Sequence, residues 1–582
     1  MREDGKPGRR CPRAAPRAPR AHQMRKGHMH RREFIRTGAA FSLVSLSATR
    51  PHTWWEMPDL VLRGATVFDG SGAPGVEADV AVVGDRIHAV GRISARGSLE
   101  VDLRGKVLSP GFIDIHTHAD LPLLANPRAE NRVLQGITLE VGGQCGGSPG
   151  PWGEEEFRSI RERYASLYGV DVDFRDLGGF FRALERTPPS VNAACMVGHG
   201  TVRGTVVGHD DRPATPEEVA SMRLLVREAL QQGAVGLSSG LEYTPSGFAS
   251  KEELVELARE LEGWGYPYAS HMRNEDDALL AAVEEALHVG RVAGVPVQIS
   301  HLKAQGERNW WKGLAALEVI ESAAAQGSAV HFDRYPYVAY STGLSNLFPA
   351  SARGGGTEAF LARLEDPAAR PALEAYAREK VSQLGSWNSV QVSSIGTRGN
   401  AWLKGLRLGD AAKATGEEPF DLALRLLREE SGSVGMIGFG MSEENTAHIL
   451  SHPRGMICSD GSVYAPSGPL SEGMPHPRSY GTFPRVLGHY VREEGLMPLE
   501  TAIFKMTGLP ARKLKLRDRG ILRTGAFADL VAFDPDTVAD RATFDEPHRY
   551  PLGIELVVVN GVVTVREGEM TGELAGRPVR GV

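Results

Sequence analysis

The rhythm of hydrophobic and polar positions divides the chain into a strand-rich start, a mixed middle and a strand-rich end. From Asp59 to Val107, segments such as LVLRGATVFDG and ADVAVVGDRIHAVG alternate apolar and polar residues, which is typical of half-buried strands. Residues 521–582 repeat this pattern in ADLVAFDP and ELVVVNGVVTVREG, where Asn560-Gly561 favours a type I′ hairpin turn. The pattern predicts that segments 51–107 and 521–582 pair into one small β-sandwich.

Residues 108–520 alternate short apolar strands with amphipathic helices. The eight strand candidates are GFIDIHTH, GITLEVGGQC, VNAACMVGH, GAVGLSSGL, PYASHMR, PVQISHLK, SAVHFDRYPY and GMICSDG. Thr215 and Ser250 each stand three residues before a Glu, which predicts a capping box at the start of a helix. Eight such units favour an α/β fold of the (β/α)8 TIM-barrel type over an open doubly wound sheet. The long gap before the last strand predicts an insertion at about 338–455, as a lid or small subdomain over the barrel mouth.

Composition excludes several classes of protein. The chain has 582 residues, 41% hydrophobic and 24% charged, which suits a large globular core, and its four cysteines are too few for a disulfide scaffold. Residues 1–50 hold 13 basic and 3 acidic residues, whereas the remainder holds 53 basic and 69 acidic residues. The acidic body argues against nucleic acid or a membrane as a partner, and the oligomeric state stays open.

The basic leader has the features of an export signal. Residues 1–28 are rich in Arg, Pro, Ala and His and predict disorder. The segment HRREFIRTGAAFSLVSLSA, residues 30–48, resembles a twin-arginine signal. We therefore expect a periplasmic or secreted protein, with translation starting at Met24 or Met29 and cleavage after Ala48. The alternative is a solvated basic tail, which would leave the protein in the cytoplasm.

Polar groups of metal-binding type occur at the ends of the predicted strands. They are His116 and His118 on the first, Cys145 on the second, His199 on the third, His271 on the fifth, His301 on the sixth and Asp460 on the eighth. The carboxyl ends of barrel strands open on one cavity, so residues distant in sequence converge there. Imidazole, thiolate and carboxylate groups together suit zinc best among the common metals. Asp333 could orient Tyr335 or a ligand, while Cys195 and Cys458 lie inside apolar runs and are predicted to be core.

The motifs around these residues resemble one family. GFIDIHTHAD, GGQCGGSPGP, GHGTVRG, GAVGLSSGLEYTPS, ASHMRNE, ISHLKAQG, DRYPYVAYST, CSDGS and HPRSYGTFPRVLGHY occur in the order of the N-acyl-D-amino-acid deacylases, or D-aminoacylases, of the amidohydrolase superfamily. The resemblance covers about residues 58–582. One departure is Gly-Gly-Gln-Cys in place of the Gly-Asn-Cys of the best-known members.

The resemblance implies a role for each matching residue. Cys145, His271 and His301 would hold one tight zinc ion, and His116, His118 and Asp460 would form a second, weaker metal position. Asp460 would also serve as general base and acid for a metal-activated water. Arg478 would hold the substrate carboxylate, and Tyr243, Ser341, Lys303 and Tyr335 would support substrate binding.

The implied reaction removes the acyl group from an N-acyl-D-amino acid, a small-molecule substrate, giving a D-amino acid and a carboxylate. Three related activities stay open: a D-residue dipeptidase, an acylase specialised for acidic side chains, and a cyclic amidase of hydantoinase or dihydroorotase type. The cyclic amidases usually carry a bridging lysine on the fourth strand, and GAVGLSSGL has none. A binding protein without catalysis would be expected to lack a ligand or Asp460, yet every expected position is filled.

Overall fold

A computed structural model of the chain describes residues 57–581. The predicted export signal lies outside the described residues. The described part belongs to a single compact unit. None of its helices is both long enough and apolar enough to cross a membrane.

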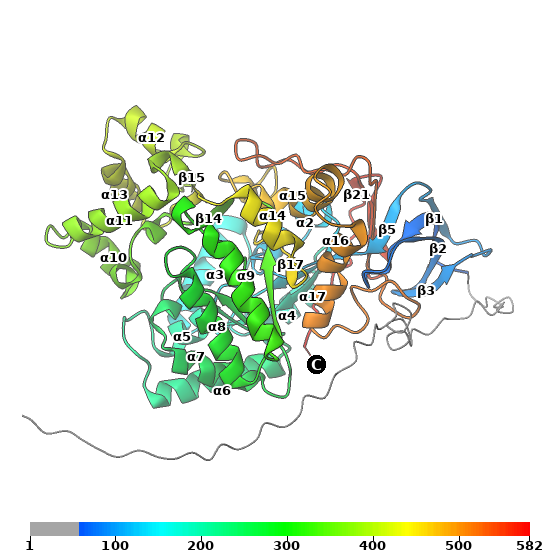
Figure 1. Ribbon diagram of the computed structural model, residues 1–582, viewed down its shortest axis with the longest axis horizontal. Coiled ribbons are helices and arrows are strands. Elements are labelled where there is room, and N and C mark those ends of the chain that lie inside the picture. The colour runs from blue at the N-terminus through cyan, green and yellow to red at the C-terminus, as the bar shows by residue number, and fades with distance from the viewer. Residues whose placement is uncertain (1–56, 582) are drawn as a thin grey trace, which may run out of the picture. The chain divides into compact units, whose positions relative to one another are not determined.

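The two ends of the chain pair as predicted in one mixed sheet of nine strands, drawn in blue and red in Figure 1. The strands are β1 (Leu60–Val67), β2 (Val76–Val83), β3 (Arg86–Gly91), β4 (Leu99–Asp102), β5 (Val107–Pro110), β18 (Leu530–Phe533), β19 (Ile554–Val559), β20 (Val562–Arg566) and β21 (Glu569–Met570). β5 pairs antiparallel with β18 and thereby joins the amino-terminal strands to the carboxyl-terminal ones. Asn560 and Gly561 have φ angles of 47° and 83°, as the predicted type I′ turn between β19 and β20 requires.

All eight predicted barrel strands are present in sequence order. They are β6 (Phe112–Asp114), β7 (Ile137–Gly142), β8 (Asn192–Cys195) continued by β9 (Val197–Gly198), β10 (Leu237–Gly240), β11 (Tyr268–His271), β12 (Val297–Ile299), β13 (Val330–Arg334) and β17 (Gly455–Ile457). Neighbouring strands pair in parallel from β6 to β8 and from β9 to β17. Main-chain bonds from Asp460 N to His116 O (2.9 Å) and from His118 N to Gly461 O (2.7 Å) connect the last strand's exit to the first.

Helices surround this barrel in the order that the amphipathic pattern predicts. They are α1 (Pro122–Ala125), α2 (Glu130–Val133), α3 (Glu154–Tyr168), α4 (Leu177–Arg186), α5 (His199–Val206), α6 (Pro216–Gln231), α7 (Lys251–Ala258), α8 (Leu279–Ala293), α9 (Trp311–Ala325), α14 (Glu443–Ser451), α15 (Arg478–Arg485), α16 (Leu499–Met506) and α17 (Gly508–Lys513). Thr215 forms the full predicted capping box with Glu218. Ser250 forms only half of one, because the Glu253 carboxylate binds Arg203 instead.

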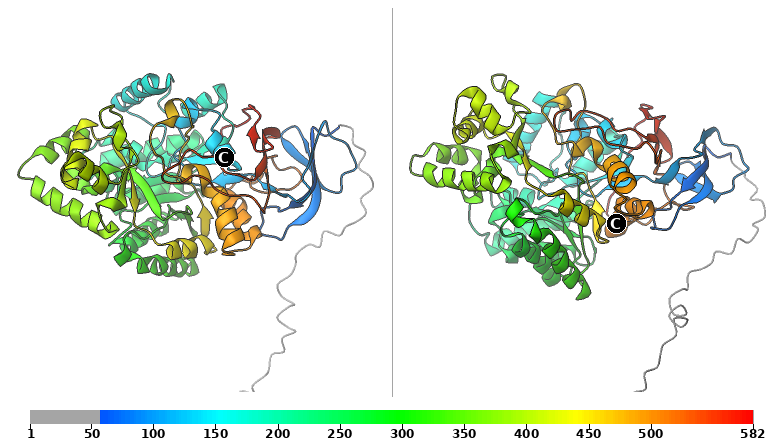
Figure 2. Two further views of the ribbon diagram at one scale, coloured as in Figure 1. Left: turned by 90° about the horizontal axis from the view of Figure 1, so that it is seen from above. Right: turned by 45° about the horizontal axis from the view of Figure 1, so that its top comes forward.

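The insertion after β13 forms a separate lobe (Figures 1 and 2). It contains a three-stranded antiparallel sheet of β14 (Ala339–Gly343), β16 (Gly435–Phe439) and β15 (Val390–Ser394), with α10 (Gly356–Glu365), α11 (Arg370–Leu384), α12 (Leu408–Thr415) and α13 (Pro419–Glu429). Helix α14 packs against α9 and β17 as part of the barrel. The inserted lobe therefore ends before Glu443, short of the expected residue 455.

Candidate metal centre and active site

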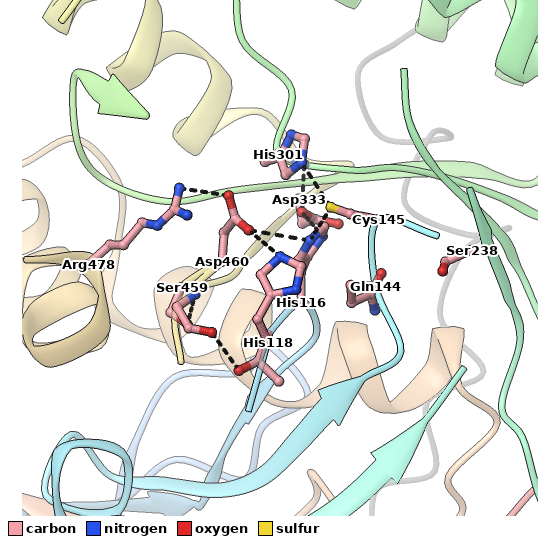
Figure 3. Close-up of polar contacts among 12 residues, drawn as sticks. His116, His118, Gln144, Cys145, Ser238, His301, Asp333, Ser459, Asp460 and Arg478 are labelled. Atoms are coloured by element: carbon pink, nitrogen blue, oxygen red, sulfur yellow. Dashed lines mark hydrogen bonds and ion pairs between the residues drawn. The ribbon is translucent and has the colours of Figure 1, made fainter. Parts of the chain in front are cut away.

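The six residues predicted as metal ligands meet at the carboxyl ends of the barrel strands; Figure 3 labels five of them, all but His271. They form two overlapping groups, within each of which the ligand atoms lie no more than 4.8 Å apart: His116, His118, Cys145 and Asp460 in one, and Cys145, His271 and His301 in the other. The Cys145 Sγ lies 3.3 Å from His116 Nε2 and 3.5 Å from His301 Nε2. The thiolate is therefore available to both metal positions, whereas the sequence-based assignment gave it to one.

The backbone around this cluster is strained at three of its own residues. Cys145, His301 and Asp460 have φ angles of 51°, 35° and 49°, in the left-handed region that residues with a Cβ rarely adopt. Such conformations cost on the order of 1–3 kcal/mol each and gather at functional sites. Gly240, at the end of β10, permits the close approach of this loop, because a Cβ there would lie 2.1 Å from the Cys145 carbonyl oxygen.

The electrostatics of the cluster favour a Cys145 thiolate beside a protonated His271. Burial alone would raise the pKa of the Cys145 thiol, but the His116 and His301 imidazoles outweigh it and hold that pKa well below its ordinary value. Burial alone would lower the pKa of His271, but Glu275, Cys145 and Glu242 raise it to about 10. A metal ion binds the deprotonated forms, so it competes with these protons for the same atoms.

The donor set fits zinc. Cys145, His271 and His301 offer the sulfur and nitrogen ligands that zinc prefers, and three protein ligands leave a fourth tetrahedral position for water or substrate. The Nδ1 atom of His271 is buried and has no hydrogen-bond partner in the described part of the chain. Buried polar atoms are rarely left without a partner, so this nitrogen is consistent with a place for a ligand.

Carboxylates behind the cluster hold the imidazoles in place. The Asp333 Oδ1 accepts a hydrogen bond from His301 N at 2.7 Å and lies 3.3 Å from His116 Nδ1. Of the two roles open to Asp333, the contacts favour orienting ligands over orienting Tyr335. The Glu275 Oε1 lies 2.9 Å from His301 Nδ1 and 2.6 Å from Lys303 Nζ. His301 Nδ1 also lies 2.7 Å from Lys303 Nζ, so both side chains engage that nitrogen, and Nε2, the atom nearest the thiolate, faces the metal positions.

Asp460 and Arg478 face each other at the edge of the cluster (Figure 3). The Asp460 Oδ2 lies 2.7 Å from Arg478 Nη1, and its Oδ1 lies 3.0 Å from His118 Nε2. Burial would raise the pKa of Asp460, but Arg478 and the neighbouring histidines hold it well below its usual range. Arg478 also lies over the Tyr335 ring, 4.8 Å from its centroid, and the buried Tyr335 hydroxyl has no partner in residues 57–581.

A cavity of about 360 Å³ connects these groups. The predicted substrate-binding residues Tyr243, Ser341, Lys303, Tyr335 and Arg478 all line it. An adjoining recess of about 190 Å³ shares the walls formed by His118, Ser341, Asp460 and Arg478. A larger groove between α8 and α9 contains none of these residues.

Sequence reasoning missed other lining residues: Glu242, Glu275, Gln305, Tyr340, Thr342, Asn346 and Lys380. Glu242 follows the fourth strand directly, so the strand-end argument could have found it. Lys380 comes from α11 of the inserted lobe, and its Nζ binds Asp276 at 2.6 Å. No local pattern in the sequence indicated that this lysine would reach the barrel mouth.

His199 is the one strand-end histidine that does not join the metal cluster. Its Nδ1 lies 2.8 Å from Ser246 Oγ and its Nε2 lies 3.0 Å from Glu253 Oε1. Both ring nitrogens are thus occupied, and His199 serves the packing of α5 against α7. Cys195 and Cys458 are buried, as predicted.

The barrel, its mixed sheet and the thiolate–imidazole–carboxylate cluster together define a metal-dependent hydrolase of the amidohydrolase type. The sequence pattern of the amidohydrolase family matches residues 99–565. The D-aminoacylase of Alcaligenes xylosoxydans xylosoxydans is 40% identical over 520 residues, covering 89% of this chain and 97% of the relative. The chain therefore belongs to the D-aminoacylase family within the amidohydrolases.

Solved structures of the same family match the whole fold. One is a D-aminoacylase with a binuclear metal centre, in which one metal activates and the second attenuates. It is 38% identical to this chain with a TM-score of 0.75, and the match covers 90% of this chain and 99% of that one. The N-acyl-D-glutamate deacylase of Bordetella bronchiseptica, complexed with zinc and a phosphonate that mimics the tetrahedral intermediate, is 35% identical with a TM-score of 0.77. That match covers 90% of this chain and 100% of the other.

Proposed function

We propose that this protein is a zinc-dependent deacylase of N-acyl-D-amino acids, which releases a D-amino acid and a carboxylate. The observation that carries the proposal is the Cys145, His271 and His301 group beside Asp460 and Arg478, at the mouth of a barrel that shares its family's fold. Zinc at these donors supplies Lewis acidity and an activated water.

Asp460 is suited to move the proton that amide hydrolysis requires. Its carboxylate lies beside both ligand groups, and Oδ1 is within 3.5 Å of His116 Nε2 and 3.0 Å of His118 Nε2. From there it accepts a proton from the attacking water and delivers it to the departing nitrogen. The amine leaves readily only once its nitrogen is protonated, so delivering the proton to this nitrogen is as important as removing it from the water.

Arg478 and Tyr335 are suited to hold the substrate's carboxylate. Arg478 is 6% exposed, and an arginine so deeply buried requires an anionic partner, which Asp460 provides at 2.7 Å. An arriving carboxylate shares the guanidinium with Asp460, and the unpartnered Tyr335 hydroxyl gives it a second donor. Lys303, which already binds Glu275, lines the same cavity, with its Nζ 5.9 Å from the Tyr335 ring centroid, and adds positive charge to the cavity wall.

The metal positions are proposed to differ in strength. Cys145, His271 and His301 form the tight position, and His116, His118 and Asp460, with access to the same thiolate, form a weaker one. In the related D-aminoacylase, one metal activates and a second attenuates. Activity measured against added zinc tests this assignment: it is expected to rise until one equivalent is bound and to fall beyond it. A rise continuing to two equivalents contradicts it.

A substrate panel tests the function itself. Zinc-loaded protein is expected to hydrolyse N-acetyl-D-leucine, N-acetyl-D-glutamate or N-acetyl-D-aspartate, and to leave hydantoin and D-dipeptides largely intact. Faster turnover of hydantoin would establish a cyclic amidase, and faster turnover of a D-dipeptide would establish a D-residue dipeptidase. The relative rates within the panel also define the preferred side chain.

Export is a separate proposal, supported by the Arg31-Arg32 pair and the weakly apolar segment after it. The twin-arginine pathway carries folded proteins, so a Cys145 site could be loaded in the reducing cytoplasm before export. Sequencing the amino terminus of mature protein from the periplasm tests this. Mature protein that retains residues 31–48 contradicts it.

A further inference from the structure

A buried group of polar side chains at α2 contacts the residues that flank Asp460 and Arg478 in the chain. It consists of Asn131, Arg132 and Gln135, which we call the α2 cluster; all three are fully buried. None of them touches the cavity, and the reaction proposed above does not use them. Burying three polar side chains, one of them charged, is costly unless their hydrogen bonds are made, so their partners matter.

All three side chains converge on one carbonyl oxygen, that of Ser479. Asn131 Nδ2 and Gln135 Nε2 each donate to it at 2.9 Å, and Arg132 Nη1 donates at 3.2 Å. Ser479 directly follows Arg478 at the start of α15. The backbone next to Arg478 is therefore held by three donors that do not line the cavity.

Arg132 also reaches the residue before Asp460. Its Nη2 donates to Ser459 Oγ at 2.8 Å, and Ser459 N in turn donates to Asp114 Oδ1 at 2.9 Å. The buried carboxylates of Asp114 and Glu140 both pair with the Arg132 guanidinium. The planar guanidinium of Arg132 thus links Ser479, which follows Arg478, to Ser459, which precedes Asp460.

Asn131 extends the same link to the loop beyond Asp460. Its Nδ2 donates to Ser462 O at 2.9 Å, while its Oδ1 accepts from Tyr464 N at 3.1 Å. Asp460 itself has a strained backbone, with φ of 49°, which the surrounding contacts must maintain. The α2 cluster provides such contacts on both sides of it.

We propose that the α2 cluster consists of positioning residues that fix Arg478 relative to Asp460, so that the substrate carboxylate and the acid–base carboxylate keep a productive separation. The proposal rests on the deacylase function above. Misplacement of reacting groups by about 1 Å can cost on the order of a hundredfold in rate. Loosening the cluster is therefore expected to act on substrate binding through Arg478, and on turnover through Asp460.

Gln135→Met is the sharpest variant, because it keeps the side-chain length and removes only the donor. The Gln135 Oε1 has no partner within the described chain, so the bonds lost are those that Nε2 donates, to Ser479 O at 2.9 Å and to Asn131 O at 2.6 Å within the same cluster. Gln391→Met is a matched control: Gln391 is also buried, its Oε1 is also unpartnered, and its Nε2 donates to Gly405 O at 2.8 Å in the inserted lobe. Arg132→Lys keeps the positive charge and removes the fork.

KM and kcat per bound zinc are measured for the wild type and the three variants with the best N-acyl-D-amino acid. Gln135→Met is expected to raise KM at least threefold, and Arg132→Lys to raise KM and lower kcat together by at least tenfold. Gln391→Met is expected to leave both unchanged. A merely structural role lowers the amount of active, zinc-loaded enzyme without moving KM.

Two negative results would have different meanings. Wild-type protein that hydrolyses no N-acyl-D-amino acid overturns the deacylase function itself. Wild-type turnover with KM of Gln135→Met equal to that of Gln391→Met overturns the positioning role alone. If Arg132→Lys fails to fold, the comparison of Gln135→Met with Gln391→Met still decides the question. The unfolding temperatures of these two variants are measured as well, so that a difference in KM can be separated from a difference in stability.

Discussion

Replacing Glu275 with glutamine tests how the structure prepares His301 for zinc. Glu275 Oε1 lies 2.9 Å from His301 Nδ1, and Oε2 accepts from Gln305 Nε2 at 2.8 Å. The carboxylate thereby fixes the ring so that Nε2 faces Cys145, 3.5 Å from Sγ. A glutamine keeps the shape but loses the charge that makes the imidazole a stronger ligand.

Loss of such a supporting carboxylate costs about 10–100-fold in metal affinity, or roughly 1.4–2.8 kcal/mol. Lys303 adds to this effect, because its Nζ lies 2.6 Å from the same carboxylate and would face a neutral amide in the variant. We therefore expect zinc affinity to fall toward the upper end of that range. Competition against a chromophoric zinc chelator measures the dissociation constant directly.

The exposed neighbour Asp277, which binds Arg308, provides the control. Asp277→Asn is expected to leave zinc affinity unchanged, because it has no contact with the ligand group. If Glu275→Gln and Asp277→Asn bind zinc as tightly as the wild type, the reasoning that Glu275 orients His301 is refuted.

Four further predictions concern the same site. Asp460→Asn is expected to lower kcat by about 10²–10⁴-fold while zinc analysis still finds one ion per chain, because the amide cannot carry the proton; wild-type kcat in the loaded variant would contradict the acid–base role. Arg478→Lys is expected to raise KM about tenfold or more, since one ammonium cannot replace the fork that holds a carboxylate, and an unchanged KM would remove Arg478 from substrate binding. Zinc affinity is expected to rise with pH between 6 and 8, because the pKa of His271 is raised to about 10 and a bound zinc ion must displace the proton from that ring. Calorimetry in buffers of different ionisation enthalpy would detect the released proton, and binding without proton release would contradict this account. Gly240→Ala is expected to lower the unfolding temperature and zinc content together, because its Cβ would lie 2.1 Å from the Cys145 carbonyl oxygen, and a fully loaded variant of normal stability would contradict that account.

The alternation of apolar strands and amphipathic helices was sufficient to predict the barrel, because each unit is encoded locally. The same holds for the hairpin at Asn560-Gly561, where two residues suited to positive φ stand between apolar runs. The pairing of the two chain ends was also predictable, since strands without partners at each end require one another.

Features that arise from tertiary contacts could not be predicted. The left-handed backbone at Cys145 depends on the close approach of Gly240, 95 residues away in the sequence. Lys380 reaches the cavity only because the inserted lobe folds back over the barrel, and its helix shows no signal of this. His199 illustrates the opposite error: it ends a strand like the ligands do, but Glu253 and Ser246 bind both of its nitrogens.

The enantiomer ratio on zinc-quantified enzyme tests the central claim most directly. Values of kcat/KM are measured for N-acetyl-D-methionine and N-acetyl-L-methionine at one zinc per chain, and again after zinc is removed and restored. The account predicts hydrolysis of the D-enantiomer at least a hundredfold faster, lost with zinc and regained with it. Equal rates for the two enantiomers, or turnover that persists without zinc, would contradict it.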